Sequence, residues 1–182
     1  MKLIKYMLAG MMMLAASTHA LAQKNQVVNG GFENELDGWV DYSAKVTPYM
    51  YSSGKMSSAI FSSDSSKWTG MHQVVPLPKN TQYILMSAKI KADAVSTGTK
   101  SWNGALFLFE TLNKQGAKIG EGINIASVTG DQDWKLYEKA YIIPSGVTQI
   151  KLLFALGYVT GTMFIDEVSL KVITQSEFEK YL

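Results

Sequence analysis

Residues 27–33 read VVNGGFE, residues 37–39 read DGW, and residues 164–170 read FIDEVSL. The first two stretches lie near the start of the chain and the third lies near its end. Between them apolar and polar residues alternate, and clusters of Gly, Asn, Ser and Pro interrupt the alternation. A period of two is typical of β-strands that are buried on one face. The two ends and the sequence between them therefore predict an all-β protein.

The alternation is clear in the window 105–112, where Phe107 and Phe109 fall on the face opposite to Leu106. Ten windows of this kind are expected to form strands: residues 39–43, 45–51, 56–62, 70–75, 83–91, 105–112, 123–128, 134–143, 150–156 and 163–172. Turn residues separate the windows. Ten short strands favour a two-sheet β-sandwich, and helical character is expected only in residues 175–182.

The last window, residues 163–172, contains an acidic residue within an apolar pattern. Strict alternation places Asp166 on the same face as Phe164, Val168 and Leu170. The pattern therefore predicts a carboxylate among core residues. A carboxylate in that position needs a cation or several hydrogen-bond donors to offset its loss of hydration.

Residues 1–22 have the features of a signal peptide. Lys2 and Lys5 give a positive start, residues 7–16 are apolar, and small residues suit cleavage after Ala22. The apolar run is shorter than a helix that spans a bilayer. We therefore expect an exported protein, periplasmic or secreted, without membrane insertion.

The mature chain is expected to form one domain, residues 23–173, followed by a short tail, residues 174–182. It contains no cysteine, so no disulfide framework is expected. The 17 basic residues are all lysines, and without Lys2 and Lys5 the remaining 15 balance the 15 Asp and Glu residues. A neutral chain without arginine is poorly suited to bind phosphate, which argues against a nucleic-acid partner.

Several short motifs resemble, in their order, the carbohydrate-binding modules of the CenC type, which include families 4, 9, 16 and 22. The matching segments are NGGFE at 29–33, GW at 38–39, SGK at 53–55, WTG at 68–70, DW at 133–134 and IDEV at 165–168. The resemblance covers nearly the whole mature chain. It implies a β-sandwich of the jelly-roll type that binds a polysaccharide or oligosaccharide on a concave sheet without cleaving it.

The resemblance also implies a structural calcium ion that joins the first strand, the SG turn and the last strand. Transferred to this sequence, the ligands are backbone carbonyls near Gly31 and Gly54 and the carboxylate of Asp166. Calcium prefers such oxygen ligands. The alternative is that Asp166 accepts backbone N–H bonds without a metal, and Glu33 either contributes to the ion or caps a turn.

Three aromatic residues are candidates for stacking on sugar rings. Tyr42 and Trp68 fall where similar modules place binding aromatics, and Trp102 lies among polar residues at a strand entry. The alternative is that each ring packs against the sandwich. Trp39 and Trp134 begin apolar alternations and are assigned to structure.

Two departures from the pattern of the similar modules leave the glycan unnamed: arginine is absent, and LLFAL at 152–156 replaces a glutamine-containing strand.

Catalysis is not expected. His72 is the sole histidine of the mature chain and lies in a strand-like window, which argues against a catalytic triad or a histidine zinc site. The acidic residues Glu33, Glu35 and Asp37 lie between glycines, so a turn explains their spacing. A glycoside hydrolase or lyase accessory with weak activity is the less favoured hypothesis.

A protein-binding role is the main alternative. Sandwiches of this kind also serve in adhesion or assembly, where exposed aromatics form a protein interface. The tail, residues 174–182, ends in apolar residues and is a candidate to dock on a protein partner, although it is equally able to fray.

Overall fold

The computed structural model describes residues 24–41 and 43–182. The expected signal peptide and Tyr42 lie outside the described residues. The elements in chain order are β1 (Val40–Asp41), β2 (Ala44–Thr47), β3 (Ser57–Ser62), β4 (Trp68–Pro76), β5 (Tyr83–Val95), β6 (Gly104–Leu112), β7 (Lys118–Val128), β8 (Gly130–Ile142), β9 (Gln149–Gly157), β10 (Gly161–Val172), α1 (Gln175–Phe178) and the 3₁₀ turn η1 (Glu179–Tyr181).

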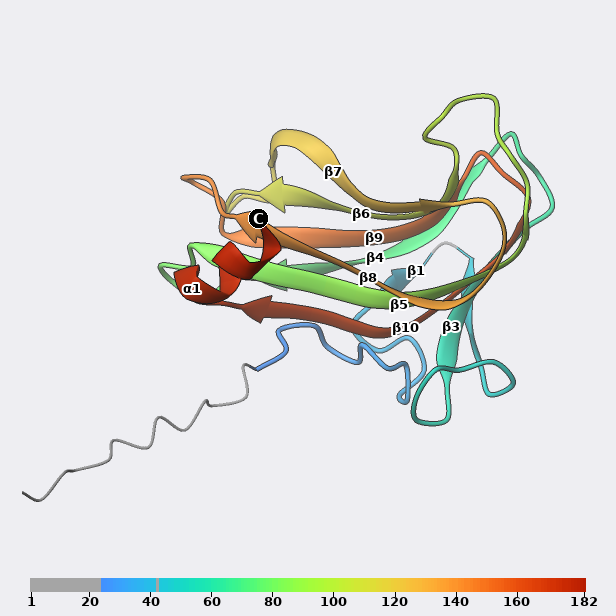
Figure 1. Cartoon of the computed structure of the whole chain (residues 1–182), viewed down its shortest axis with the longest axis horizontal. Coiled ribbons are helices and arrows are strands. Elements are labelled where there is room, and N and C mark those ends of the chain that lie inside the picture. Colours follow the sequence, from blue (N-terminus) through green and yellow to red (C-terminus); the bar gives the residue numbers. More distant parts are fainter. Residues whose placement is uncertain (1–23, 42) are drawn as a thin grey trace, which may run out of the picture.

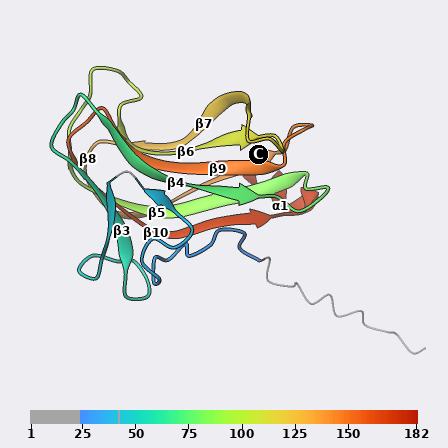
Figure 2. The same cartoon turned by 180° about the vertical axis from the view of Figure 1, so that it is seen from behind.

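The strands form two antiparallel sheets that pack face to face (Figures 1 and 2). Sheet A has the order β1-β4-β9-β6-β7, and sheet B has the order β2-β3-β10-β5-β8. Each of the ten predicted strand windows overlaps one of these strands. The all-β, two-sheet β-sandwich that the sequence predicts is thereby confirmed. The connections β3–β4, β5–β6 and β9–β10 cross between the sheets and lie at one end of the sandwich in both views.

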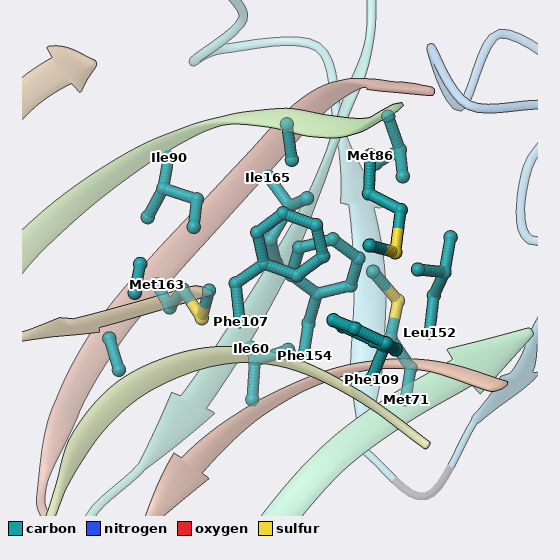
Figure 3. Close-up of a cluster of buried hydrophobic side chains, with 14 of the residues drawn as sticks. Ile60, Met71, Met86, Ile90, Phe107, Phe109, Leu152, Phe154, Met163 and Ile165 are labelled. Carbon is teal, nitrogen blue, oxygen red and sulfur yellow. The ribbon is translucent and has the colours of Figure 1, made fainter. Parts of the chain in front are cut away.

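The core lies between the two sheets, and its centre is a pair of stacked phenylalanines (Figure 3). The Phe107 and Phe154 rings are 4.5 Å apart and nearly parallel. Phe107 and Phe109 point inward and are fully buried, and Leu106 and Leu108 lie on the outer face of sheet A. The opposite facing of the two sets is confirmed, whereas the sequence did not say which set is buried. Each buried phenylalanine contributes about 1.5–3 kcal/mol to folding.

The prediction for the face of Asp166 is wrong, because a β-bulge interrupts β10. The pairing of β10 with β5 shifts register between Asp166 and Ser169, and Glu167 adopts a left-handed backbone conformation with φ of 52°. Ile165 before the bulge and Val168 after it both face the core. Asp166 therefore lies on the outer side of sheet B, and a covering segment rather than the core buries it.

The N-terminal segment, residues 24–39, runs beside β10 along the part that β3 does not pair with, and its residues Val27, Phe32 and Trp39 enter the core (Figure 1). The Gln26 amide donates to the Leu170 carbonyl at 2.8 Å, and the Val168 amide donates to the Gly30 carbonyl at 2.8 Å. A side chain at position 30 would collide with that backbone, since its Cβ would lie 2.1 Å from the Val168 carbonyl oxygen. Gly30 thus permits the close approach that brings Gly31 to the bulge.

The C-terminal tail folds back on the sandwich. Thr174 and Glu177 form a capping box that starts α1, which satisfies otherwise unpaired backbone amides. Phe178 is buried, and its ring centroid lies 5.0 Å from that of Tyr83 on β5. The helical character predicted for 175–182 is confirmed for α1 and η1. The tail thus contacts its own chain, and no helix among the described residues is long and apolar enough to cross a membrane.

Candidate functional site

Two predicted aromatic residues and one that the sequence analysis missed form a cluster at the loop end of sheet A. The Tyr158 ring lies at its centre, 6.2 Å from Trp68 and 5.9 Å from Trp102 between ring centroids, and it meets both rings edge to face. The exposed fractions of Trp68, Trp102 and Tyr158 are 41%, 42% and 43%. We call these three residues the aromatic triad, because each ring is partly fixed by packing and partly open to solvent.

The position of Trp68 depends on a glycine in the neighbouring strand. Trp68 begins β4 and pairs with Gly157 on β9, which in turn pairs with Gly104 on β6. A Cβ at position 157 would lie 3.2 Å from the Trp68 ring and 2.6 Å from Leu106. The absence of a side chain at Gly157 therefore lets the indole lie across β9 and cover Leu106, which is buried although it faces outward.

Trp102 is positioned by a closed turn in the β5–β6 connection. The Asn103 amide donates to the Lys100 carbonyl at 3.0 Å, and the Lys100 amide donates to the Asn103 side-chain oxygen at 2.8 Å. Gly98 packs against Asn103 so closely that a Cβ there would lie 2.2 Å from the Asn103 Cβ. The Lys100 ammonium lies 5.5 Å from the centre of the Trp102 ring, a distance at which a cation attracts an aromatic face.

A groove of about 520 Å³ extends from the triad over the outer face of sheet A. It is lined by Trp68, Trp102, Leu106, Leu108, Glu110, Lys118, Glu121, Gly122 and Asn124. These residues come from the start of β4, the β5–β6 connection, β6 and β7. Leu106 and Leu108 give the groove an apolar floor beside the two indoles.

The other end of the groove is charged and tightly paired. The Glu110 carboxylate lies 3.3 Å from the Lys118 ammonium and 3.6 Å from the Lys151 ammonium. His72 lies one row nearer the triad, and its pKa is lowered below 6.5 by burial and by Lys151, an effect that Glu110 partly opposes. The groove therefore combines apolar surface with a fixed carboxylate that still has lone pairs for further donors.

The other predicted aromatic positions separate into structural and undescribed residues. Trp39 is buried, with its ring 5.4 Å from Phe32 and 5.9 Å from Phe154 between centroids, which confirms its structural assignment. Trp134 is half-buried on β8. The sequence analysis missed Tyr158 because it follows the last residue of β9 in a left-handed conformation, with φ of 58°, and belongs to no alternating window.

The predicted metal residues converge on the outside of sheet B. Asp166 is fully buried, and its carboxylate accepts backbone N–H bonds from Ser52 and Ser53, both at 2.9 Å, and from Glu167 at 2.6 Å. Burial raises the pKa of Asp166, and the three N–H donors offset this in part. The carboxylate thus accepts the backbone N–H bonds that are expected if Asp166 binds no metal. Burial nevertheless still disfavours its charged form.

Glu33 adjoins two of the three predicted metal positions, Gly31 and Gly54. A Cβ at position 31 would lie 3.9 Å from Asp166 Oδ1 and 4.0 Å from Glu33 Cγ. A Cβ at position 54 would lie 2.0 Å from Glu33 Oε1. The Glu33 carboxylate caps the turn after Gly54 by accepting from the Lys55 amide at 2.7 Å. Within residues 24–41 and 43–182, no cluster of three or more His, Asp or Glu side chains is arranged to hold a metal. Any ion here would need backbone carbonyls beside the two carboxylates, and the glycines leave room for such ligands.

The fold and the aromatic groove define a β-sandwich of the carbohydrate-binding class. A family model described as "Carbohydrate binding domain" (CBM_4_9) matches residues 24–162. The match covers most of the chain, so the protein belongs to this family of carbohydrate-binding modules, whose members bind sugars without cleaving them. No curated protein matches the sequence significantly.

Solved structures confirm the fold at low sequence identity. The CBM22-1 xylan-binding domain from Paenibacillus barcinonensis Xyn10C has a TM-score of 0.59 and 17% identity over 84% of this chain and 97% of that domain. TmCBM61, solved with β-1,4-galactotriose, has a TM-score of 0.56 and 17% identity over 83% of this chain and all of that module. The enzymatically active domain of tailspike protein 4 from bacteriophage CBA120 has a TM-score of 0.64 and 16% identity. That match covers 82% of this chain, which spans 21% of the tailspike chain.

Proposed function

We propose that this protein binds a polysaccharide in the groove on sheet A, with the sugar rings stacked on Trp68 and Trp102. The observation that carries the proposal is the aromatic triad itself. Two tryptophans that start from different elements, β4 and the β5–β6 connection, converge on one tyrosine at the end of an apolar groove. Three adjoining rings, each with about two-fifths of its surface exposed, form a continuous apolar patch, and such patches mark interaction sites.

The groove matches the chemistry of a sugar chain. A pyranose ring has an apolar C–H face and a rim of hydroxyl groups. The triad and the leucine floor suit the apolar face, whereas Glu110 and Asn124 suit the rim as hydrogen-bond partners. The ion pairs with Lys118 and Lys151 hold Glu110 in place before a ligand binds, so less side-chain entropy is lost on binding.

The relatives guide the choice of ligands to test. One similar structure is a xylan-binding domain and another holds β-1,4-galactotriose, so β-linked polysaccharides are the first candidates for this chain. We propose a neutral β-linked chain. The described lining residues of the groove include one lysine and two glutamates, and Lys151, which pairs with Glu110 from beside the groove, balances the second glutamate.

We further propose that a calcium ion strengthens the contact between the N-terminal segment and β10. The ion would be held by the Asp166 carboxylate, with backbone carbonyls near Gly31 and Gly54, and Glu33 adjoins both glycines. Its chemistry is purely electrostatic: a divalent cation offsets the burial that raises the pKa of Asp166. Residues 1–22 support export of the protein to the periplasm or the medium.

Affinity electrophoresis tests the binding proposal. The mature protein is run through gels that contain xylan, β-glucan, mannan or β-1,4-galactan, and retardation in one gel is expected. The double variant Trp68→Ala/Trp102→Ala should lose this retardation. Phe61→Ala is the matched control, because Phe61 is 63% exposed but lies on sheet B. This variant should be retarded as the wild type is. Equal retardation of the double variant and the control would contradict the site.

A further inference from the structure

A second hollow lies on the opposite side of the triad, at the loop end of the sandwich. This loop pocket has a volume of about 600 Å³ and is lined by Ser65, Ser96, Thr97, Gly98, Thr99, Lys100, Trp102, Asn103, Tyr158 and Thr160. Trp102 lines both the loop pocket and the groove, whereas Trp68 lines the groove and Tyr158 lines the loop pocket. The triad is therefore a partition between two spaces, and one ring is shared by both.

The loop pocket has a framework that is fixed by backbone bonds. Ser96 and Thr160 tie the β5–β6 and β9–β10 connections together, since the Ser96 amide donates to the Thr160 carbonyl at 2.9 Å and the Thr160 amide donates to Ser96 Oγ at 3.0 Å. The Tyr158 amide donates to the Lys67 carbonyl at 3.2 Å, which adds the β3–β4 connection. Three loops that meet in Figures 1 and 2 are thus joined, so the pocket does not need to be assembled by its ligand.

The lining of the loop pocket favours an uncharged, hydroxylated ligand. Hydroxyl side chains dominate it, one amide side chain belongs to Asn103, and Lys100 is the one charged residue among the described lining residues. Lys100 is directed to the Trp102 ring. Serine and threonine hydroxyls both donate and accept, as the hydroxyls of a sugar do, and an aromatic ring on one side suits a pyranose face. A volume of this size lies within the usual range of small-ligand sites.

We propose that the loop pocket is a second sugar-binding compartment, which takes the units of the glycan that extend past Trp102. The inference rests on the proposed function, because the same chain occupies the groove on the other side of the partition. The chain would then pass from the outer face of sheet A over Trp102 to the inter-sheet loops. Affinity should consequently rise in two steps with ligand length, first when the groove is filled and again when the loop pocket is reached.

The test is calorimetric titration of wild-type protein and variants with oligosaccharides of increasing length, taken from whichever polysaccharide retards the protein. Thr97→Trp and Thr99→Trp each place a large ring at an exposed loop position and fill the pocket. Leu108→Trp fills the groove instead. Lys114→Trp is the matched control, since it adds the same ring at an exposed position in the β6–β7 turn.

We expect the two threonine variants to bind short oligosaccharides as the wild type does and to bind long ones roughly tenfold more weakly. A tenfold loss corresponds to one or two hydrogen bonds between the ligand and the loop pocket. Leu108→Trp should weaken binding at every length, and Lys114→Trp should weaken none. If long and short ligands are affected alike by both threonine variants, the second compartment is refuted while the groove stands. If the wild type binds no oligosaccharide in the panel, the proposed function fails first and the inference fails with it.

Discussion

The central tyrosine of the triad offers the sharpest prediction about how the site is built. Tyr158→Ala removes the ring that both tryptophans contact and leaves their own side chains intact. Position 158 has a φ of 58°, a conformation that strains alanine as much as tyrosine, so the substitution does not relieve backbone strain. The change therefore isolates the contribution of the two ring contacts.

The magnitude follows from the two edge-to-face pairs, which have centroid separations of 6.2 and 5.9 Å. Such pairs contribute about 0.5–1.5 kcal/mol each beyond burial. Tyr158→Ala should therefore remove about 1–3 kcal/mol of the interaction energy that holds the two indoles in place. If that positioning is used to hold the sugar, affinity should fall roughly fivefold to 150-fold. Tyr158→Phe keeps both ring contacts and should stay within about twofold of wild type in the groove.

The assay is titration of each variant with the oligosaccharide that the wild type binds, followed by tryptophan fluorescence. Tyr158→Ala should lose affinity and shift its emission to longer wavelength, because Trp68 and Trp102 become more exposed. A variant that keeps wild-type affinity and an unchanged emission spectrum would refute the reasoning that Tyr158 orders the two indoles.

Three further predictions concern the cation, the core and the pH dependence. Calcium should raise the unfolding temperature of the wild type, compared with the value in chelator, but should not raise that of Asp166→Asn. The exposed control Glu35→Gln should respond to calcium as the wild type does. Equal responses of all three proteins would exclude Asp166 as a ligand. Phe154→Ala should cost about 3–5 kcal/mol of unfolding free energy in denaturant titrations, because it removes one ring of the central stack, and a loss below 1 kcal/mol would contradict the packing. Because the folded-state pKa of His72 lies below its unfolded value of 6.5, the unfolded state takes up the proton first on acidification. Stability should thus be full above pH 6.5 and decrease below it, and His72→Gln should show a shallower decrease in unfolding midpoint across the same pH range.

The strands were predictable because alternation reports directly on which side chains a sheet buries. Phe107 and Phe109 lie on the face opposite to Leu106 and Leu108, as their spacing predicts, and the structure identifies the phenylalanine face as the buried one. Alternation fails where the backbone breaks the period. The bulge after Asp166 reverses the facing of every later residue of β10, so Val168 and Leu170 are core residues although Phe164 is not. A single residue with positive φ, Glu167, causes the change, and no local pattern announces it.

The candidate site was predictable in part. Trp68 stood out because it falls where similar modules place a binding aromatic, and Trp102 because it lies among polar residues. The structure brings both rings against one tyrosine. Their common partner Tyr158 lies in the turn after Gly157, and a turn aromatic next to a glycine is a weak signal on its own. The position of Trp68 also depends on long-range register, which places it beside Gly157 and Gly104 across three strands. Such a row, with an indole next to two glycines, is visible only once the pairing of strands distant in sequence is known.

The most direct test of glycan binding at the triad is an NMR titration that follows the indole N–H signals of the four tryptophans. A polysaccharide-derived oligosaccharide that binds in the groove should shift the signals of Trp68 and Trp102. It should leave that of Trp39 unchanged, since Trp39 is buried and its Nε1 donates to the Asn29 carbonyl at 3.3 Å. Shifts confined to Trp134, or no shift with any xylan, glucan, mannan or galactan oligosaccharide, would contradict the account.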